Sequence, residues 1–483
     1  MVLKIYDTLS REKREFKPLE DNIVKIYVCG PTVYDLTHVG HARTYIAFDI
    51  IVRYLKYKGY KVRYVVNITD VEDKIIRKAK EMGIPPSEVA RMYEEDFFRV
   101  VKELNLLKAD VYPRVTEHIK DIIDTIRKLI DLGYAYVVNG NVYFRVRKFE
   151  DYGKLSRQRV ESMLAGARIE MDERKEDPRD FALWKSAKKG EPYWHSPWGL
   201  GRPGWHIECT VMAVKHLGEQ IDIHGGGTVL IFPHHENEIA QSEAYTGKKP
   251  FSRFWLHTGL LTIKREKMSK SLHNIIPVVE FLKKYSADAL RLMVAQAHYR
   301  SQIDFSFEKI EELEKTLSRV YGILERLRVT SEFREVKEYR EDIEKDFLNR
   351  LKTMKREFIE AMDDDFNTPI ALSKVFEFID YYERIVEEGR DRYIRPIHLR
   401  SAYETMVELL KDILGFKLEY EQLNRSTLLL LKLIIDVRER LREMKLWNLS
   451  DAIRGRLREI GIEVRDTPQG PVWFYRPKLK TQR

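Results

Sequence analysis

We predict an α/β protein in which a Rossmann-type parallel-sheet domain contains an inserted domain and precedes an all-α region. Three observations support this fold. Between residues 26 and 68, an apolar run, a helical repeat and a second apolar run follow one another, as in the strand–helix–strand unit of a parallel sheet. Between 132 and 203 the pattern breaks up into short strands. After residue 300, apolar residues recur at helical spacing.

The length of the chain indicates several domains, because 483 residues exceed what one hydrophobic core accommodates. We expect the first half of the parallel-sheet domain at 1–131 and a connective insertion at 132–203. The second half of the sheet domain follows at 204–300, and a helical region that contacts and reads a partner follows at 301–483. Hydrophobic residues make up 43% of the chain and aromatic residues 11%, which is ordinary for a water-soluble globular protein.

The net charge and the cysteine content of the chain indicate what kind of binding partner and which cellular compartment to expect. The formal net charge is +9, from 85 basic and 76 acidic residues, which fits either a polyanionic partner or a well-solvated surface. Two cysteines 180 positions apart do not form a disulfide framework and favour a reducing compartment. The N-terminus lacks the pattern of a signal peptide, and the longest apolar cluster is too short to span a bilayer. We therefore expect a cytoplasmic protein without membrane association.

The first strand–helix–strand unit places polar residues where ligands bind in such sheets. Ile26–Cys29 reads as a buried strand, a helical pattern starts near His41 and ends at Gly59, and residues 62–68 read as the next strand. Ligands bind at the carboxyl ends of parallel strands. Cys29 and the Thr69-Asp70 pair occupy two of these ends, so we expect the chemistry there.

The remaining segments follow the same reasoning. Short strands such as the one at residues 142–146 and several aromatic residues fill the insertion, and the parallel-sheet pattern resumes near Ile207. Two helical patterns then mark the C-terminal region. Their apolar positions are Ile310, Leu313, Leu317, Val320, Leu324 and Leu327, and Leu430, Leu433, Ile434, Val437 and Leu441.

Both cysteines have possible metal-binding neighbours. Cys29 ends the first strand and Cys209 ends the run Gly204-Trp205-His206-Ile207-Glu208-Cys209. Further on, His234 and Glu238 are four residues apart, so on a helix they share a face. Two thiolates, an imidazole and a carboxylate can form a tetrahedral zinc site. The alternative is two inert buried thiols and a solvated, acidic helix start.

A pair of histidines precedes the first helix in the motif His38-Val39-Gly40-His41. A helix N-terminus offers free N–H groups and a favourable dipole to an anion. Gly40 has no side chain, so it would let a nucleotide base approach the backbone closely. The tetrapeptide alone is a weak signal, but its place directly after a strand that ends in Gly-Pro strengthens it.

A lysine-rich segment, Lys267-Met268-Ser269-Lys270-Ser271, follows a run that reads as a strand. Two lysines flanking small hydroxyl residues suit a departing pyrophosphate, whose negative charge grows as the bond breaks. A solvated lysine-rich loop is the alternative. The coincidence with the histidine motif argues against that alternative.

These two motifs together are typical of class I aminoacyl-tRNA synthetases, and nearly the whole chain resembles the cysteinyl-tRNA synthetase family within that class. The segments that resemble it lie at residues 27–35, 67–74, 180–185, 203–209, 224–227, 232–238, 288–291, 363–369 and 466–470. The segment Asp288-Ala289-Leu290-Arg291 resembles the element that opens the anticodon-binding helical domain of this family.

The resemblance implies a set of site residues. It implies zinc ligation by Cys29, Cys209, His234 and Glu238, and catalytic roles for His38, His41, Lys267 and Lys270. It implies that ATP contacts Thr32, His38, Gly40, His41, Gly225, Gly226, Gly227, Met268 and Lys270. It implies that the amino acid contacts Gly30, Thr69 and Trp205. For Thr69, an ordinary residue at a strand end remains the alternative, and His206, Glu208, His235 and Glu236 are candidates to support the ligands.

The resemblance also implies an activity. Members of this family activate L-cysteine with ATP and Mg²⁺ to cysteinyl-adenylate and transfer the cysteine to the terminal ribose of tRNA(Cys). One Zn²⁺ per chain selects the cysteine thiolate, and the C-terminal region reads the anticodon; the chain would be a monomer or a homodimer. Three alternatives stay open: a purely structural zinc, an ATP-dependent ligase that joins cysteine to an amino sugar, and a non-catalytic tRNA- or zinc-binding relative.

The chain departs from the family pattern at two positions. Val229 stands where the family has an aspartate that resembles an acceptor for the ribose hydroxyls of ATP, and His273 stands where glycine is usual. Valine accepts no hydrogen bond. We therefore expect either weaker ATP binding or a substitute carboxylate, with Asp222 as the candidate.

Overall fold

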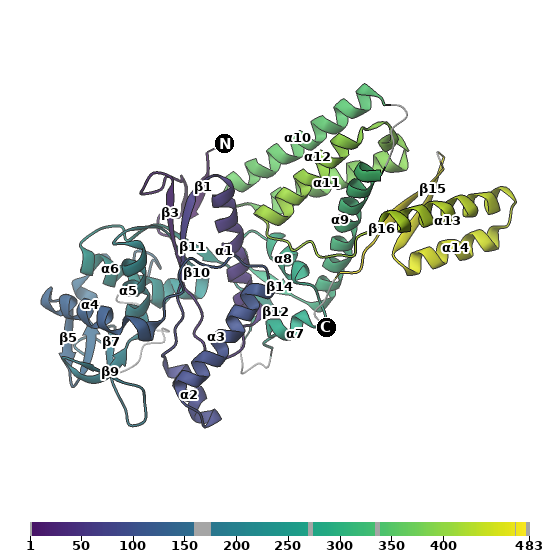
Figure 1. Cartoon of the computed structure of the whole chain (residues 1–483). Coiled ribbons are helices and arrows are strands. Elements are labelled where there is room, and N and C mark those ends of the chain that lie inside the picture. Colours follow the sequence, from purple (N-terminus) through teal and green to yellow (C-terminus); the bar gives the residue numbers. More distant parts are fainter. Residues whose placement is uncertain (1, 159–174, 269–273, 334–338, 469, 480–483) are drawn as a thin grey trace. The chain divides into compact units, whose positions relative to one another are not determined.

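The computed structural model describes the chain except for residues 1, 159–174, 269–273, 334–338, 469 and 480–483 (Figure 1). The chain divides into two compact units. The first unit comprises Val2–Val279 and Tyr299–Ile303, and the second comprises Glu280–His298 and Asp304–Arg483. In the chain, the short helix α7 (Val278–Leu282) and strand β14 (Ile303–Phe305) cross the boundaries between them.

A parallel four-stranded sheet forms the centre of the first unit and confirms the predicted fold class. Its strands lie in the order β11-β10-β3-β4 and pair in parallel throughout. They are β3 (Ile23–Val28), β4 (Lys61–Val66), β10 (Ile221–Gly227) and β11 (Ser252–Thr258). β3 and β10 come from opposite sides of the insertion in the sequence, so the insertion leaves and rejoins one continuous sheet.

Helix α1 (Val39–Tyr57) connects β3 to β4, as the apolar spacing predicts. His38 caps its first turn, and the chain leaves the helix through Gly59, whose φ of 94° favours glycine. The other helices of this unit are α2 (Asp73–Met82), α3 (Pro86–Glu103), α4 (Ile119–Asp131), α5 (Trp205–Leu217) and α6 (Glu236–Thr246). Two small pairings complete it, β1 (Lys4–Asp7) with β2 (Glu12–Glu15) and β12 (Leu261–Ile263) with β13 (Glu266–Lys267).

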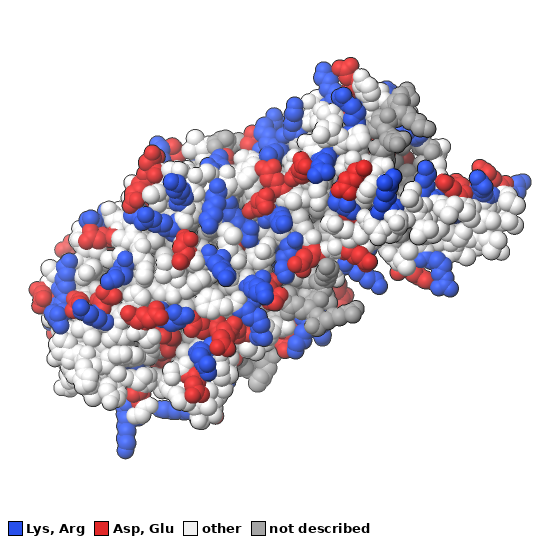
Figure 2. All heavy atoms as spheres, viewed as in Figure 1, with Lys and Arg blue, Asp and Glu red and all other residues white. Residues whose placement is uncertain are grey.

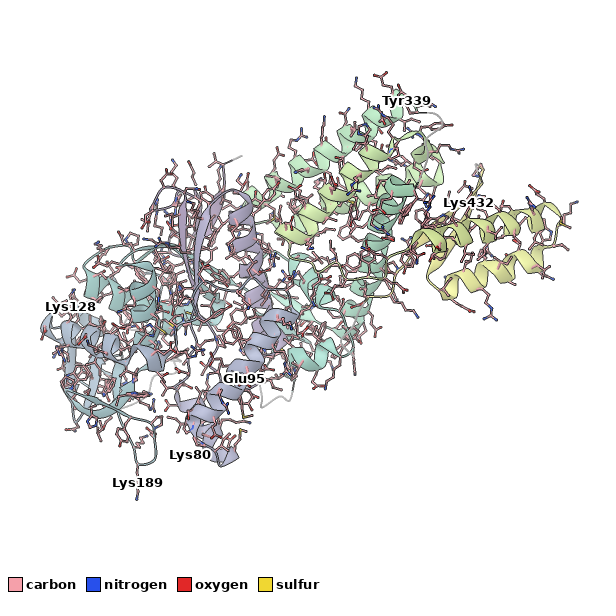
Figure 3. The ribbon with its side chains drawn as sticks, in the orientation of Figure 1. Lys80, Glu95, Lys128, Lys189, Tyr339 and Lys432 are labelled. Carbon is pink, nitrogen blue, oxygen red and sulfur yellow. The ribbon has the colours of Figure 1, made fainter. Side chains whose placement is uncertain are left out.

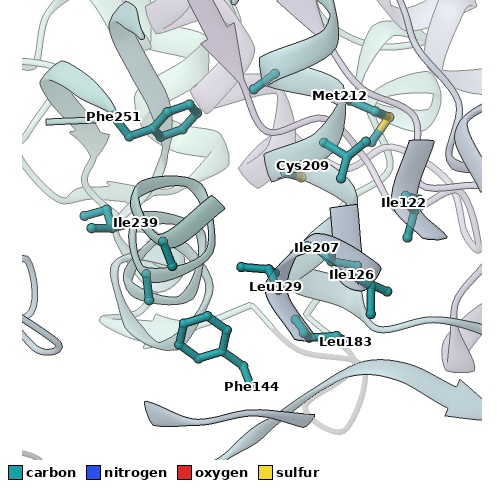
Figure 4. Packing of buried hydrophobic residues seen from close by; sticks show 14 of the residues in the cluster. Ile122, Ile126, Leu129, Phe144, Leu183, Ile207, Cys209, Met212, Ile239 and Phe251 are labelled. Carbon is teal, nitrogen blue, oxygen red and sulfur yellow. The ribbon is translucent and has the colours of Figure 1, made fainter. Parts of the chain in front are cut away.

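The segment predicted as an insertion forms an antiparallel sheet of five strands in the order β5-β6-β7-β9-β8. The strands are β5 (Ala135–Val138), β6 (Asn141–Phe144), β7 (Phe181–Ser186), β8 (Trp194–Ser196) and β9 (Gly199–Pro203). Phe144 and Leu183 of this sheet belong to one buried cluster with Ile207, Cys209 and Met212 of α5 (Figure 4). The insertion and the helix that carries Cys209 thus share a hydrophobic core.

The second unit is helical, as predicted, with one β-hairpin in addition. Its helices are α8 (Ala287–Ala295), α9 (Phe307–Phe333), α10 (Glu341–Asp363), α11 (Thr368–Glu387), α12 (Pro396–Val407), α13 (Arg425–Glu443) and α14 (Trp447–Glu459). The hairpin pairs β15 (Ile462–Thr467) with β16 (Gly470–Tyr475). Gly470 stands at the turn with a φ of 109°, a conformation that favours glycine.

The motif Asp288-Ala289-Leu290-Arg291 lies on α8 and holds the second unit together. The buried Asp288 carboxylate accepts hydrogen bonds from the Tyr321 hydroxyl and from the backbone N–H groups of Lys417 and Leu418. Arg291 donates to the carbonyl of Leu414 at 3.0 Å. Among the described residues, no helix has the length and apolar character needed to cross a bilayer.

Candidate metal centre and nucleotide edge

The carboxyl edge of the parallel sheet brings the predicted residues of the first unit together. Cys29 follows β3, and its N–H donates to the carbonyl of Gly225 on the neighbouring β10 at 3.0 Å. Thr32 and Thr69 form a bridge between the segments that follow β3 and β4. After β3 the chain continues to β4 on one side of the sheet, and after β10 it continues to β11 on the other side. Cys29 therefore lies at a topological switch point, where ligands bind in such folds.

Four buried side chains form a group that could hold a metal ion. The donor atoms of Cys29, Cys209, His234 and Glu238 all lie within 4.8 Å of one another. His234 lies in the turn before α6 and Glu238 in the first turn of that helix, so their four-residue spacing brings Nε2 and Oε1 to 3.0 Å. Two thiols, an imidazole and a carboxylate match the ligands that zinc takes in proteins, so the donor set fits such an ion.

The electrostatics of this group also suit a cation. Burial alone would lower the pKa of His234, but Glu238 and Cys209 outweigh it and raise this pKa to about 10. Burial disfavours the Glu238 carboxylate, but His224 and His234 hold its pKa at about 2. The Cys29 thiol donates to Cys209 and, with His234, lowers the pKa of Cys209 to about 6. Cys209 and Glu238 are thus held as anions, whereas burial raises the pKa of the Cys29 thiol well above its usual range. A divalent cation at this position would displace the protons of Cys29 and His234.

Two further histidines, for which the sequence predicted no role, lie next to this group. One contacts a donor directly, and the other contacts His235. His224, in the middle of β10, lies 2.9 Å from Glu238 through its Nε2, and it forms a second possible metal-holding group with Cys29, His235 and Glu238. His257 on β11 lies 2.7 Å from Nδ1 of His235. Each directly follows an apolar strand residue, Ile223 or Leu256, which is the one signal in the sequence that could have identified them.

The four residues predicted to support the ligands have different partners in the structure. His206 contacts His234 at 3.0 Å, and His235 contacts the Cys29 sulfur at 3.3 Å. Glu208 accepts a hydrogen bond from the Thr69 hydroxyl at 3.5 Å. Glu236 does not support a donor. Its buried carboxylate accepts backbone N–H groups of the insertion, from Gly153 at 3.0 Å and Ser156 at 2.8 Å.

The three predicted amino-acid contacts, Gly30, Thr69 and Trp205, lie around the metal group. The Trp205 ring stacks on His234 with a centroid distance of 4.5 Å. Thr69 receives a hydrogen bond from the Asn67 amide at 3.2 Å, and Asn67 in turn accepts the Gly30 N–H at 2.8 Å. A Cβ atom at Gly30 would lie 1.6 Å from the Asn67 carbonyl, so glycine is required there.

The histidine motif forms the N-terminus of α1. Nδ1 of His38 accepts the backbone N–H groups of Gly40 at 3.1 Å and His41 at 3.3 Å, so the proton of the neutral ring resides on Nε2. The rings of His38 and His41 stack at 3.6 Å. A Cβ atom at Gly40 would lie 2.6 Å from the Met268 methyl group, which shows that the two predicted motifs meet. Lys267 ends β13, but its side chain and Lys270 lie outside the described residues, as does His273.

The three glycines at the end of β10 have different surroundings. A Cβ at Gly225 would meet the Phe48 ring at 2.2 Å, and one at Gly226 would meet the His235 ring at 2.9 Å. Both positions are thus filled by protein. Only Gly227 has open space, with its nearest neighbour, Val229, at 3.8 Å. Of the three glycines predicted to contact ATP, Gly227 is the one whose missing side chain leaves room for a ligand.

The idea that Asp222 substitutes for the family aspartate is wrong. Asp222 lies near the amino end of β10, at the opposite edge of the sheet from Gly227. Its two carboxylate oxygens accept the backbone N–H groups of Leu19 at 2.6 Å and Lys25 at 2.8 Å. Its role is therefore to fasten the segment before β3.

Comparison with known proteins agrees with this geometry. Residues 15–315 match the family model described as tRNA synthetases class I (C) catalytic domain, and residues 357–419 match the DALR domain. A cysteine–tRNA ligase of Thermococcus onnurineus is 49% identical, covering 98% of this chain and 99% of its own length. One of Thermococcus kodakarensis is 51% identical, with the same coverage.

Solved structures support the fold. A methionyl-tRNA synthetase of Mycobacterium tuberculosis, in complex with methionyl-adenylate, superposes with a TM-score of 0.65 at 15% identity, covering 82% of this chain and 92% of the other. At that identity the likeness concerns the fold alone. The matches of sequence over nearly the full length decide the family. This chain belongs to the cysteine–tRNA ligases, a family of class I aminoacyl-tRNA synthetases.

Proposed function

We propose that this enzyme activates L-cysteine with ATP and transfers it to tRNA(Cys) in the cytoplasm. The observation that supports this most directly is the buried group of Cys29, Cys209, His234 and Glu238, in which Cys29 follows the strand that precedes α1. One part of the site is chemically suited to a thiol-selecting metal, and the adjacent part to a nucleotide phosphate. The relatives that share the whole length of the chain carry the same activity in their name.

Cys29, Cys209, His234 and Glu238 would hold one zinc ion. When bound there, zinc supplies an acceptor for the thiolate of a substrate cysteine, which the hydroxyl of serine does not match. Trp205, stacked on His234, would close one side of the amino-acid pocket. His206 and His224 each contact a donor, so they would hold His234 and Glu238 in orientation.

In the first step, the cysteine carboxylate attacks the α-phosphorus of ATP, and the bond to the β-phosphate breaks to release pyrophosphate with its Mg²⁺. His38 and His41 would stabilise the charge that develops on the phosphate, because Nδ1 of His38 accepts the capping N–H groups and Nε2 carries the proton that a phosphate oxygen can accept. Lys267 and Lys270 would stabilise the departing pyrophosphate. The nucleotide would lie against Thr32, Gly40, Gly227 and Met268. Because the two glycines have no side chain, they would leave room for the base next to the backbone.

In the second step, the terminal 2′-hydroxyl of the tRNA attacks the acyl carbon, and AMP departs with the bonding electrons. We assign no general base, because positioning and electrostatics supply most of the rate in such transfers. The helical region at 301–483 would bind the tRNA, with basic side chains on phosphates and a few side chains on unstacked bases.

Removal of the chain after about residue 310 tests this division of labour. We expect the truncated protein to retain cysteine-dependent ATP–pyrophosphate exchange and to lose efficient tRNA charging, because the sheet and the metal group lie in the first unit. Both assays are run on the same preparation beside the full chain. Normal charging by the truncated protein would refute the assignment of tRNA binding.

The full-length chain in the same assays also separates the alternative functions. A ligase that joins cysteine to an amino sugar would show exchange but no charging of tRNA(Cys) under any condition. A non-catalytic relative would show neither reaction while still binding tRNA. Cysteine-dependent exchange together with charging is the result that the proposal requires.

Val229→Asp tests the missing ribose acceptor. Val229 is 48% exposed and lies beside Gly227, so a carboxylate can replace it without repacking a core. We expect ATP to bind about tenfold more tightly or better, because a charged hydrogen bond contributes roughly 1.5–3 kcal/mol. Val229→Asn is the control for shape without charge. Unchanged or weaker ATP binding by the aspartate variant, measured by calorimetry, would show that this position does not face the ribose.

A further inference from the structure

One arginine of α1 is fully buried, which is rare for a charged side chain. Arg43 is 1% exposed and lies two residues after the histidine motif. Other basic side chains lie on the surface, where Figure 2 shows them mixed with acidic ones. The exposed lysines that Figure 3 labels, such as Lys80, Lys128 and Lys189, extend outward from the ribbon. A guanidinium is buried only where protein groups replace its water.

Backbone carbonyl groups hold the guanidinium of Arg43. It donates to the carbonyl oxygens of Gly259 and Ser301 and, at 3.1 Å, to that of Tyr299. Within the described chain no carboxylate pairs with it. Burial lowers the pKa of Arg43 to about 10, so the side chain is still charged at neutral pH. Arg43 is therefore a buried cation that is satisfied by carbonyl dipoles alone.

These carbonyls belong to two segments of the first unit that approach each other closely. Gly259 follows β11, and its N–H donates to the carbonyl of Tyr299 at 3.0 Å. A Cβ atom at Gly259 would lie 2.4 Å from the carbonyl oxygen of Ser301, so glycine is required there. Carbonyl oxygens that converge repel one another, and the planar fork of a guanidinium can bind several of them at once. Arg43 thus locks the two segments together.

The locked junction is the root of the hairpin that leads to the lysine-rich segment. From Gly259 the chain enters β12 and then β13, which ends at Lys267. The residue next to Arg43 contacts the same root, because the Thr44 and Thr258 hydroxyls lie 2.9 Å apart. Two consecutive side chains of α1 therefore hold the chain where the hairpin begins.

The chain that follows the lysine-rich segment also returns to the start of α1. The N–H of Val39 donates to the carbonyl of Ile276 at 3.0 Å. The N–H of Val278 donates to the carbonyl of Thr37 at 2.8 Å. Both ends of the stretch 260–275 are thus fastened to the helix that begins with the histidine motif. The contacts of Arg43 fix where one of these ends stands relative to that motif.

We propose that Arg43 is a positioning residue for adenylate formation. It fixes the root of the hairpin on α1, so that Lys267 and Lys270 reach the departing pyrophosphate while the histidine motif faces the α-phosphate. A misplacement of about 1 Å, caused far from the reacting atoms, can slow a reaction roughly 10²-fold. The inference rests on the roles proposed above for the two lysines and adds the group that sets their position.

Arg43→Lys tests this role in the full-length chain. It keeps the positive charge but replaces the planar fork with a compact ammonium. Cysteine-dependent pyrophosphate release, measured before the steady state, should slow roughly tenfold to a hundredfold. Transfer of cysteine from preformed adenylate to tRNA(Cys) should keep the wild-type rate, because pyrophosphate has already left. Cysteine affinity and zinc content should also stay unchanged, because the metal group does not include this residue.

Arg53→Lys is the matched control, because it makes the same change at a second arginine of α1. Arg53 donates to the Asp49 carboxylate at 2.9 Å and to the Asn105 carbonyl at 2.7 Å, neither of which belongs to the hairpin or its root. Both variants should lower the midpoint of thermal unfolding by a few degrees. Only Arg43→Lys should slow the first step, and equal rates in the two variants would overturn the proposal.

A double-mutant comparison shows whether Arg43 acts through the lysines. In a chain that carries Lys267→Ala and Lys270→Ala, adding Arg43→Lys should slow pyrophosphate release less than about twofold, because the groups that it positions are absent. A loss as large as in the wild-type background would overturn the proposal. A wild-type rate in the chain without the two lysines would contradict the role assigned to them, and the inference with it, before residue 43 is changed.

Gly259→Ala disturbs the same root without changing Arg43. Its Cβ atom would meet the carbonyl of Ser301, so the two segments must move apart. The variant should slow the first step by a factor similar to that of Arg43→Lys, and it should lose this effect in the chain without the two lysines. Pyrophosphate release at the wild-type rate in Gly259→Ala would show that the root does not control the reaction, which would refute the inference.

Discussion

Cys209→Ser should remove the metal from this protein. The wild-type chain should contain about one zinc ion, and the variant far less than that, because a hydroxyl replaces a buried thiolate donor. Cysteine activation should fall by at least about a hundredfold, since changes at residues that only support the ligands already cost about 10–100-fold. Metal analysis of the purified protein and ATP–pyrophosphate exchange measure the two effects separately.

The matched control for this variant lies on the same helix. Met212→Leu, three residues further along α5, changes a residue of the buried cluster shown in Figure 4 but no donor, so it should keep both metal and activity. Selectivity gives a further readout, because loss of the thiol acceptor should abolish the preference for cysteine over serine. A zinc-free Cys209→Ser protein with full activity and selectivity would contradict the proposed role of the site.

His38→Asn should slow adenylate formation by roughly 10²–10³-fold without destabilising the protein. The size of the effect is that of removing one positioned donor from a developing negative charge. Asparagine is a good N-cap residue, so its side-chain oxygen can accept the N–H groups that His38 Nδ1 accepts at the start of α1. The measurement is pre-steady-state pyrophosphate release, together with thermal unfolding.

His38→Ala distinguishes catalysis from capping at this position. It should slow the reaction as much as asparagine does and in addition lower the free energy of unfolding by about 1 kcal/mol, the usual cost of a lost cap. If His38→Asn retained the wild-type rate while His38→Ala lost it, the histidine would serve only as a cap. Cysteine affinity should stay unchanged in both variants, because the metal group does not include this residue.

The sequence predicted the parts of the fold that local pattern controls. α1 begins after His38 and ends before Gly59, as its apolar spacing and its glycine indicate. The β15–β16 hairpin escaped notice because a short alternating run such as residues 462–467 cannot be told from the end of a helical segment without its partner strand. Whether such a run pairs with a second strand across a turn depends on contacts between the two strands, which the pattern of one run does not show.

The candidate metal group was predicted from family resemblance and donor type, and its surroundings were not. His224 contacts Glu238, and His257 contacts His235, only because β10 and β11 lie side by side in the sheet, which no spacing in the sequence reveals. The suggestion about Asp222 failed for the same reason. Its distance in sequence from Gly227 is short, but a strand of seven residues carries it to the other edge of the sheet.

The first turn of α6 has a consequence for how the insertion is held. Glu236 binds the backbone of Gly153 and Ser156, and Glu238, two residues further on, belongs to the metal group. Both carboxylates depend on the same helical turn. By linkage, a bound ion that orders this turn strengthens the attachment of the loop, and a loosened loop weakens the affinity for the ion by an equal factor. If the group holds a metal ion, the attachment of the insertion would depend on the free metal concentration as well as on the fold.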